Sequence, residues 1–596
     1  MSERKIDPIT LEVIRGALGS VCYEMGLAME RTAFSPIFSE GLDYSFAIFD
    51  GKGEMVAQHA FDPCHMACMP FSVEWVAEEI GLENLEPGDL IMHNDPFRGG
   101  SHLSDITMMT PVFKDGVLVG IPANRAHQID IGGMVPGGFA GDATEIFQEG
   151  IRIPPVKIVS RGKEVKDVWN ILFANVRDSY TMQGDVRAMM GALNVGKRRL
   201  LEYTDKYGIE IWNNALEETK NVAEKQMRSE IDAIPDGRYE YADYLDDAGT
   251  TTDPLKIQVA ITIRGSNLIA DFEGSSKQCQ GPMNAPYAVT AGNTVIGVLH
   301  CTNVKGNFNP NHGCFRPIKV LAPAGTIVNA DFPAAVQGGN VEISTRVCDA
   351  VIGALGQAVD PGNVKAADFG SLYSQTAGGI HPETNQPWVH YQWGCGGTGA
   401  RATKDGMNVT SPFCTNNKNQ TIEVLETRFP IIFEYYSMLR DTPGPGKWRG
   451  GVGIGQAWTL TADEAIISSV GDRTRISPYG VFGGLPPKAL KQCGHFCDTR
   501  IRRAGEQEFK HATELFEAVS PSKWSGFRMR KHDTFETTTT GGGGYGNPIE
   551  RDPELVLQDL IDDYISVESA SDSYSVVIDP STLAVNYEAT RKLRGR

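Results

Sequence analysis

Residues 234–249, IPDGRYEYADYLDDAG, mark the change of pattern that decides the fold of this chain. Before this segment, residues 165–233 carry apolar side chains at helical spacing. After it, polar and apolar residues alternate in three successive runs, as they do in half-buried strands. The Pro-Asp-Gly turn at 235–237 suits the junction, because proline and glycine favour a turn over a continuing helix. The sequence therefore predicts a helical region that gives way to antiparallel sheet.

Elsewhere, the same patterns extend this picture. Helices are expected at 7–33, 69–80, 341–358 and 552–564, and hairpins around Asp50-Gly51 and Asp115-Gly116. We expect a mixed α+β, multidomain fold with a helical and hairpin-rich N-terminal half and an antiparallel-sheet-rich C-terminal half. Three regions are predicted: an N-terminal metal-binding region with helices (1–233), a mixed α/β region (234–420) and a β-rich C-terminal region (421–596).

The composition narrows the class of protein. The chain has 596 residues, 55 basic and 74 acidic, for a net charge of −19, which argues against nucleic-acid binding. No apolar run has membrane-spanning length, and the N-terminus does not resemble a signal peptide. The eleven cysteines are odd in number and scattered, which favours reduced thiols. We therefore expect a cytoplasmic protein that binds neither membrane nor nucleic acid.

Glycine is in excess, and its clusters surround the candidate chemistry. The 65 glycines are about 11 % of the chain, against a usual share of about 7 %. One cluster lies in HNDPFRGGSHLSD (93–105), and RAHQIDIGG (125–133) follows it; together they hold His93, Asp95, His102, Asp105, His127 and Asp130. The clusters beyond residue 420 are expected to be turns between strands.

Four of the residues in and near these segments could share one metal ion. His102 and Asp105 are three apart in a loop, and His127 returns on the strand after the Asp115-Gly116 hairpin. Asp43, in the first hairpin, could complete four ligands. Two imidazoles and two carboxylates suit Zn(II), Mn(II) or Fe(II). The alternative is that the glycine-rich loop uses these side chains to hydrogen-bond its own turns.

A pair of acids follows in DATEIFQEG (142–150). Glu145 and Glu149 are four apart and would share one face of a helix, where either could act as a general acid or base at a cleft edge. The alternative is a solvated helix end. Catalytic roles for Glu145 and Glu149 are therefore stated as a hypothesis.

Other motifs speak against further sites. The CHMAC (64–68) and CGHFC (493–497) runs lack a matched second pair of ligands and are interpreted as buried structural thiols. The GPGKWRGGVGIG run (444–455) lacks the spacing of a phosphate loop, and no GxSxG motif is present. No nucleotide-binding residues are predicted, so any ATP used would be held by another polypeptide.

Eight segments in order along residues 7–590 resemble the hydantoinase B family. These proteins are the β-type subunits of ATP-dependent hydantoinases, caprolactamases and 5-oxoprolinases, related to the large subunits of acetone and acetophenone carboxylases. The segments are HNDPFRGGSHLSDITMMTPVF, DATEIFQEGIRIPPVKI, NVRDSYTMQGDVRA, YLDDAG, GCFRPIKVLAPAGTIVNADFPAAVQGGNVE, EVLETRFPI, GKWRGGVGIG and GGGGYGNPIERDPELV.

The resemblance implies a site, a partner and a reaction. It implies that Asp43, His102, Asp105 and His127 bind a divalent metal, zinc by likeness to lactam hydrolases or manganese by likeness to acetone carboxylase. It also implies a hydantoinase A-type partner that binds ATP and magnesium, in a hetero-oligomer such as an α2β2 assembly. The expected reaction is hydrolysis of a cyclic amide after phosphorylation by that partner. The alternatives are a ketone carboxylase that uses bicarbonate and a non-catalytic scaffold.

Overall fold

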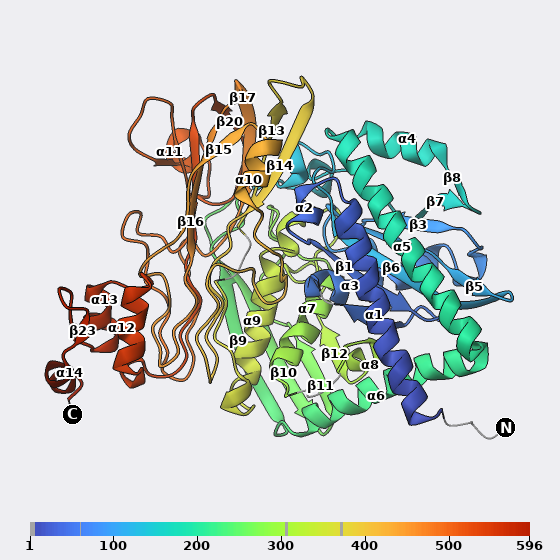
Figure 1. The fold of residues 1–596 in the computed structure, drawn as a ribbon, viewed down its shortest axis with the longest axis horizontal. Helices are drawn as coiled ribbons and strands as arrows, with labels where there is room; N and C mark the ends of the chain where they lie inside the picture. Colours follow the sequence, from blue (N-terminus) through green and yellow to red (C-terminus); the bar gives the residue numbers. More distant parts are fainter. Residues whose placement is uncertain (1–5, 60, 304–307, 370–372, 596) are drawn as a thin grey trace.

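The computed structural model describes residues 6–59, 61–303, 308–369 and 373–595 (Figure 1). The first helix, α1 (Pro8–Thr32), begins where the Asp7 carboxylate accepts a hydrogen bond from the backbone N–H of Thr10, with Pro8 in the first turn. Its apolar stripe is buried against α5 (Ser179–Tyr207), which α4 (Lys166–Ala174) precedes and α6 (Ile209–Asp232) follows. The helices predicted at 7–33 and 165–233 are therefore confirmed.

An eight-stranded sheet lies beside these helices. Its order is β2-β1-β6-β4-β3-β7-β8, with β5 paired to β6. Both predicted hairpins are present as the β1–β2 and β5–β6 pairs. The strands are β1 (Tyr44–Phe49), β2 (Met55–His59), β3 (Leu90–His93), β4 (Asp105–Met109), β5 (Val112–Lys114), β6 (Val117–His127), β7 (Val156–Ser160) and β8 (Lys163–Glu164).

Helices cover both faces of this sheet. Contacts join α1 and α5 to β1 and β6, and they join α3 (Pro63–Glu79) to β1, β4 and β6. The helix predicted at 69–80 begins earlier, at Pro63, because Asp62 caps the helix by accepting a hydrogen bond from the backbone N–H of His65. The CHMAC run is thereby the first part of α3.

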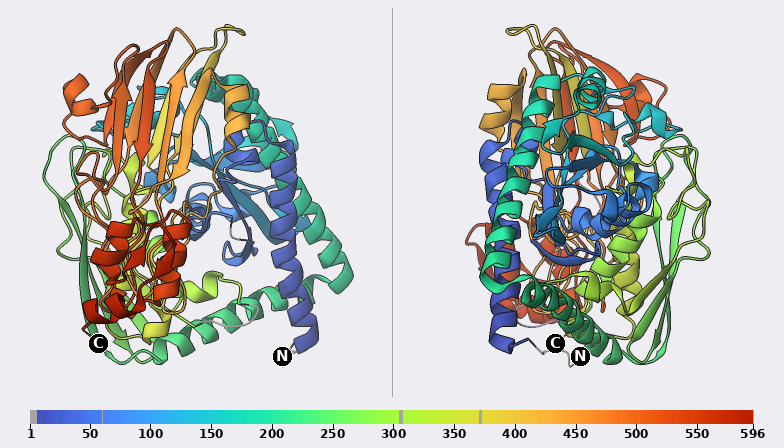
Figure 2. Two further views of the ribbon diagram at one scale, coloured as in Figure 1. Left: turned by 60° about the vertical axis from the view of Figure 1, so that its left-hand side comes forward. Right: turned by 90° about the vertical axis from the view of Figure 1, so that its right-hand side faces the viewer.

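A second sheet lies beyond α3. Helix α3 packs on α7 (Tyr287–His300), α7 on α9 (Ile343–Leu355), and α9 on β9 and β10. This sheet has the order β12-β11-β10-β9, from β9 (Gly237–Leu245), β10 (Leu255–Arg264), β11 (Asn267–Asp271) and β12 (Ile318–Leu321). Figure 2 shows this sheet on the side of the molecule away from α1 and α5. The strands predicted after the Pro235 turn are confirmed.

Two further sheets make up much of the C-terminal part. One has the order β14-β13-β17-β20 and the other β15-β16-β21-β18-β19. They contact one another: Gln392 of β14 donates to Gln456 of β16 over 3.0 Å, and Trp524 of β20 meets Phe535 of β21. Their strands are β13 (Ser374–Ile380), β14 (Pro387–Trp393), β15 (Ile431–Met438), β16 (Ile454–Leu460), β17 (Glu464–Val470), β18 (Asp498–Arg502), β19 (Lys510–His511), β20 (Trp524–Arg530) and β21 (Thr534–Thr538).

The chain ends in short helices at one side of the molecule (Figure 1): α12 (Pro553–Ile561), α13 (Val567–Tyr574) and α14 (Tyr587–Leu593). Helix α12 matches the helix expected at 552–564. Within the described residues, no helix is both long and apolar enough to span a membrane. These sheets and helices confirm the mixed α+β, multidomain class.

The glycines at 541–544 are not a turn, so that prediction was wrong for them. They run extended and buried, and their backbone N–H groups donate to four separate segments, at Thr442, Gly451, Ala367 and Leu485, over 3.0–3.2 Å. An added Cβ at Gly542 would lie 2.2 Å from the backbone carbonyl of Thr398. Glycine is required here because several backbones pack where no side chain fits. The sequence shows the glycine run but not the segments packed around it.

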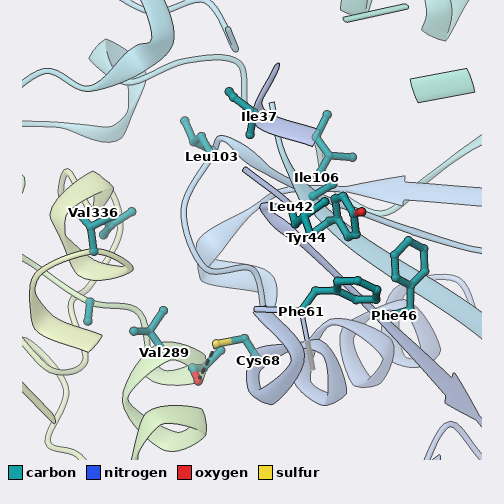
Figure 3. Close-up of a cluster of buried hydrophobic side chains, with 14 of the residues drawn as sticks. Ile37, Leu42, Tyr44, Phe46, Phe61, Cys68, Leu103, Ile106, Val289 and Val336 are labelled. Atoms are coloured by element: carbon teal, nitrogen blue, oxygen red, sulfur yellow. Dashed lines mark hydrogen bonds between the residues drawn. The ribbon is translucent and has the colours of Figure 1, made fainter. Parts of the chain in front are cut away.

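A cluster of apolar side chains lies beside the ends of β1 and β4 (Figure 3). The rings of Tyr44, Phe46 and Phe61 pack with centroids 5.0–5.9 Å apart. The Cys68 thiol donates to the Ala288 carbonyl over 3.4 Å, joining α3 to α7. This packing fixes α3 against the edge of the sheet where the polar cluster described next lies.

Candidate metal centre

Three neighbouring strands bring polar side chains to one edge of the eight-stranded sheet. Asp43 directly precedes β1, Asp105 begins β4, and His127 ends β6. In the β4–β6 pairing, Asp105 lies opposite His127, and the backbone N–H of His127 donates to the Asp43 carbonyl over 3.1 Å. The register of the sheet therefore places these residues side by side.

His102 joins them from the loop that precedes β4. The backbone N–H of Asp105 donates to the His102 carbonyl over 3.1 Å and closes a tight turn. Before this turn, Gly99 has a positive φ of 81°, and an added Cβ there would lie 2.4 Å from the Phe71 backbone. The loop thus needs glycine both for its conformation and for its close approach to α3.

The three side chains meet at one carboxylate oxygen. Asp105 Oδ1 lies 2.9 Å from His102 Nε2 and 3.1 Å from His127 Nδ1, and those two nitrogens are 3.2 Å apart. Ligands about 2.0–2.1 Å from one ion stand about 3.3 Å apart in a tetrahedron and about 3.0 Å apart in an octahedron. The observed spacing fits a shared divalent ion with little movement.

Protonation also favours a metal here. Burial lowers the pKa of His102, which keeps the ring neutral, as a ligand must be. Although burial favours the protonated acid, the rings of His102 and His65 hold the pKa of Asp105 well below its usual range. The centre therefore presents an ionised carboxylate and a neutral imidazole.

Two residues that the sequence did not single out adjoin the centre. Asp62 and His65 form a second buried group with Asp43. His65 Nε2 lies 3.0 Å from Asp105 Oδ2 and 3.7 Å from Asp43 Oδ1, so it stands between the two carboxylates. The available signal was an aspartate three residues before a histidine at a helix start, inside the CHMAC run with its thiols.

Asp43 is near the group formed by His102, Asp105 and His127 but not within it. The carboxylates of Asp43, Asp62 and Asp105 are all buried, and among the described residues their ion pairs are with histidines alone. Burial favours a neutral ring, yet the carboxylates of Asp105 and Asp62 raise the pKa of His65 to about 10. Three buried acids that pair with no lysine or arginine of the described chain are an environment suited to a divalent cation.

A surrounding layer holds the ligands in place. Asn340 donates to Asp105 Oδ2 over 3.0 Å and accepts a hydrogen bond from the Cys64 thiol over 3.1 Å, and Ser101 also donates to Asp105. The ring of Tyr391, on β14, stacks on His127 with centroids 4.8 Å apart. A strand of the C-terminal part thus forms one wall of the centre.

The two predicted acids lie in different environments. Residues 146–148 form a single 3-10 turn, so the helix face expected to carry both acids is not formed. Glu145 is exposed. Glu149 is fully buried and accepts the backbone N–H groups of Val336 and Gln337 over 3.0 and 2.8 Å. Burial raises the pKa of Glu149 to about 8.

The other acids and histidines of the glycine-rich segments serve the loops. Asp95 accepts the backbone N–H of Phe97 over 3.0 Å and pairs with Arg98, and Asp130 pairs with Arg177 over 3.1 Å. His93 is buried, and burial lowers its pKa to about 3. Of the six candidate residues in these segments, only His102, Asp105 and His127 are brought together as a metal-binding group.

The family model described as hydantoinase B/oxoprolinase matches residues 7–548. The B-type subunit of a putative D-/L-hydantoinase from a Pseudomonas species (strain NS671) is 34 % identical over 99 % of this chain and 98 % of its own length. The crystal structure of the ATP-dependent caprolactamase from Pseudomonas jessenii superposes with a TM-score of 0.88 at 30 % identity, over 100 % of both chains.

A nucleotide-free acetone carboxylase structure has the same fold. It superposes with a TM-score of 0.88 at 19 % identity, over 99 % of this chain and 83 % of that one. The match of the family model spans most of the residues, and the motifs of the metal centre lie inside it. The chain therefore belongs to the hydantoinase B/oxoprolinase family.

Proposed function

We propose that this chain is the metal-carrying catalytic subunit of an ATP-dependent enzyme that hydrolyses a cyclic amide, a hydantoin or a lactam. The observation that carries the proposal is the buried group of His102, Asp105 and His127, whose ligand atoms converge in a chain that resembles caprolactamase over its whole length.

The proposed ligands are Asp43, His102, Asp105 and His127, with zinc or manganese as the ion. When bound, such an ion supplies a Lewis acid that can polarise a carbonyl oxygen or activate water. His65 donates to Asp105 and lies against Asp43, so it orients both carboxylates. Tyr391 and its neighbour Phe139 stack with ring centroids 4.9 Å apart and limit access of water from the side of β14.

Glu149 acts at one remove from the centre in this proposal. Its carboxyl group holds the backbone at 336–337, the segment that leads to Asn340, and the Gln337 amide donates to Ser104 next to Asp105 over 3.1 Å. Glu145, at the surface, is retained as a predicted proton carrier. Replacing each by glutamine and measuring turnover separates these roles.

ATP and magnesium are proposed to be bound by a hydantoinase A-type partner, in a hetero-oligomer such as α2β2. An amide is a poor electrophile, and phosphorylation of its oxygen provides a leaving group that lowers the barrier to ring opening. One relative is named as a single subunit of a hydantoinase and another as an ATP-dependent caprolactamase, and both names support this arrangement. The cytoplasmic location expected from the sequence stays a prediction.

The test is a product assay on the chain co-expressed with the hydantoinase A-type protein encoded beside it. The panel contains hydantoins, lactams and ketones, each with ATP, with and without bicarbonate. We expect ATP-dependent ring opening that does not require bicarbonate. Carboxylation of a ketone would contradict the hydrolase proposal and favour the carboxylase alternative, to which the 19 % identical structure gives support in fold alone.

The scaffold alternative predicts no turnover from any arrangement of this site. The presence of both histidines and of Asp105 in one buried group argues against it, because unneeded buried carboxylates are costly. Full turnover by a complex that lacks metal at this centre would favour the scaffold alternative.

A further inference from the structure

A second group of metal-ligating side chains lies on the five-stranded sheet, outside the proposed catalytic centre. Cys493 and His495 are in the segment that leads into β18, Asp498 begins β18, and His511 ends β19. The ligand atoms of Cys493, His495 and Asp498 all lie within 4.8 Å of one another. The proposed function uses none of these four residues.

The Asp498 carboxylate joins the group. Its Oδ1 lies 3.0 Å from His511 Nδ1 and 3.5 Å from His495 Nδ1. These separations are close to the edge of about 3.3 Å expected between ligands of a tetrahedral ion. The pairing of β18 with β19 places Arg500 opposite His511, which fixes His511 beside the start of β18.

Two buried atoms of the group have no hydrogen-bond partner among the described residues. These are His495 Nδ1 and Asp498 Oδ2, and the Asp498 side chain is fully buried. Arg500 Nε lies 3.7 Å from Asp498 Oδ2 but donates to Glu536 over 2.8 Å. Buried polar atoms without a partner are costly, and each such atom in a native protein requires an explanation. A bound cation provides one for both.

The CGHFC run therefore contributes ligands, but not as a pair of cysteines. Cys497 is buried, and its sulfur accepts the backbone N–H of Thr540 over 3.3 Å, so it serves the packing as expected. Cys493 is half-buried and its thiol belongs to the group with His495 and Asp498. The missing partners of the motif come from Asp498 and from a histidine thirteen residues further along.

We propose that Cys493 Sγ, His495 Nδ1, Asp498 Oδ1 and His511 Nδ1 bind one zinc ion. Thiolate, imidazole and carboxylate are the ligands that Zn(II) takes in proteins, and four protein ligands are typical of a structural site. The ion would fasten the segment before β18 to the β18–β19 edge of the sheet. Its expected effect is on the stability of this edge and not on the chemistry at His102, Asp105 and His127.

Cobalt substitution tests this site separately from the catalytic centre. The purified full-length chain is stripped of metal and titrated with Co(II), and the near-ultraviolet thiolate-to-cobalt charge-transfer absorption is recorded. None of the proposed catalytic ligands is a cysteine, so this absorption reports a thiolate site. We expect it in the wild-type chain at one equivalent, and we expect zinc to displace it.

Matched variants assign the absorption. Cys493→Ser and His511→Ala are expected to lose most of it, whereas Cys279→Ser, which replaces the other half-buried thiol, is expected to keep it. Circular dichroism checks that each variant is folded. Absence of the absorption in the folded wild-type chain, or its persistence in Cys493→Ser, would overturn the proposal. Loss of cyclic-amide hydrolysis alone would not, because the two sites are separate.

Discussion

At the residue scale, the centre depends on His65 as well as on the predicted ligands. Its Nε2 lies 3.0 Å from Asp105 Oδ2. Outer-layer groups that orient a ligand typically change metal affinity by about 10–100-fold when removed. We expect His65→Gln to weaken metal binding within that range without abolishing it, as measured by competition with a chelator. His390→Gln, at another buried histidine, is the control and should leave the affinity unchanged. An unaltered affinity in His65→Gln would contradict the orienting role.

Glu149 should make stability depend on pH. Its folded-state pKa of about 8 lies above the ordinary value of 4.5, so between these values the folded chain binds more protons than the unfolded chain. The stabilisation is complete below about pH 4.5 and is lost as the pH rises through about 8. We therefore expect the free energy of unfolding to fall with pH across this window, and Glu149→Gln to reduce that slope. Chemical denaturation at several pH values measures it, and an equal slope in both proteins would refute the shift.

At the element scale, the glycine run at 541–544 is predicted to be intolerant of side chains. An added Cβ at Gly542 would lie 2.2 Å from the Thr398 carbonyl carbon and oxygen. We expect Gly542→Ala to lower the free energy of unfolding by at least about 2 kcal/mol, because backbone must move to admit the methyl group. Thermal or chemical denaturation of the full chain provides the measurement.

Gly16→Ala is the matched control for that substitution. Gly16 lies inside α1, and an added Cβ there would meet nothing within 4 Å. Alanine should be neutral or stabilise this helix by about 0.5–1 kcal/mol. Equal effects at Gly16 and Gly542 would show that packing between the extended segments is not the reason for the glycines.

The elements show which patterns a sequence can and cannot disclose. The helices at 7–33 and 341–358 and the two hairpins were predictable because their periodicity or turn residues are local. The packing of 541–544 was not, because it depends on segments up to 177 residues away, such as Ala367. His65 was missed for the same reason: its partner Asp105 is 40 residues further along the chain, and only the fold brings the two together.

At the scale of the whole molecule, the centre joins distant parts of the chain. The metal-ligand group comes from the eight-stranded sheet, Asn340 precedes α9, and Tyr391 comes from a C-terminal sheet. The region boundaries predicted at 233 and 420 stay predictions. His102, Asp105 and His127 were predictable as a group from spacing and hairpin turns. Asp43 is adjacent to that group, and its role as a ligand is a proposal.

The most direct test of the central claim is the metal content of the co-expressed complex, measured on the same samples as its ATP-dependent ring-opening activity. We predict that His127→Ala loses one equivalent of zinc or manganese per chain together with most of its turnover. His381→Ala, at a histidine outside the metal-binding group, should keep both. Wild-type turnover by His127→Ala, or full activity of the complex without metal, would contradict the account.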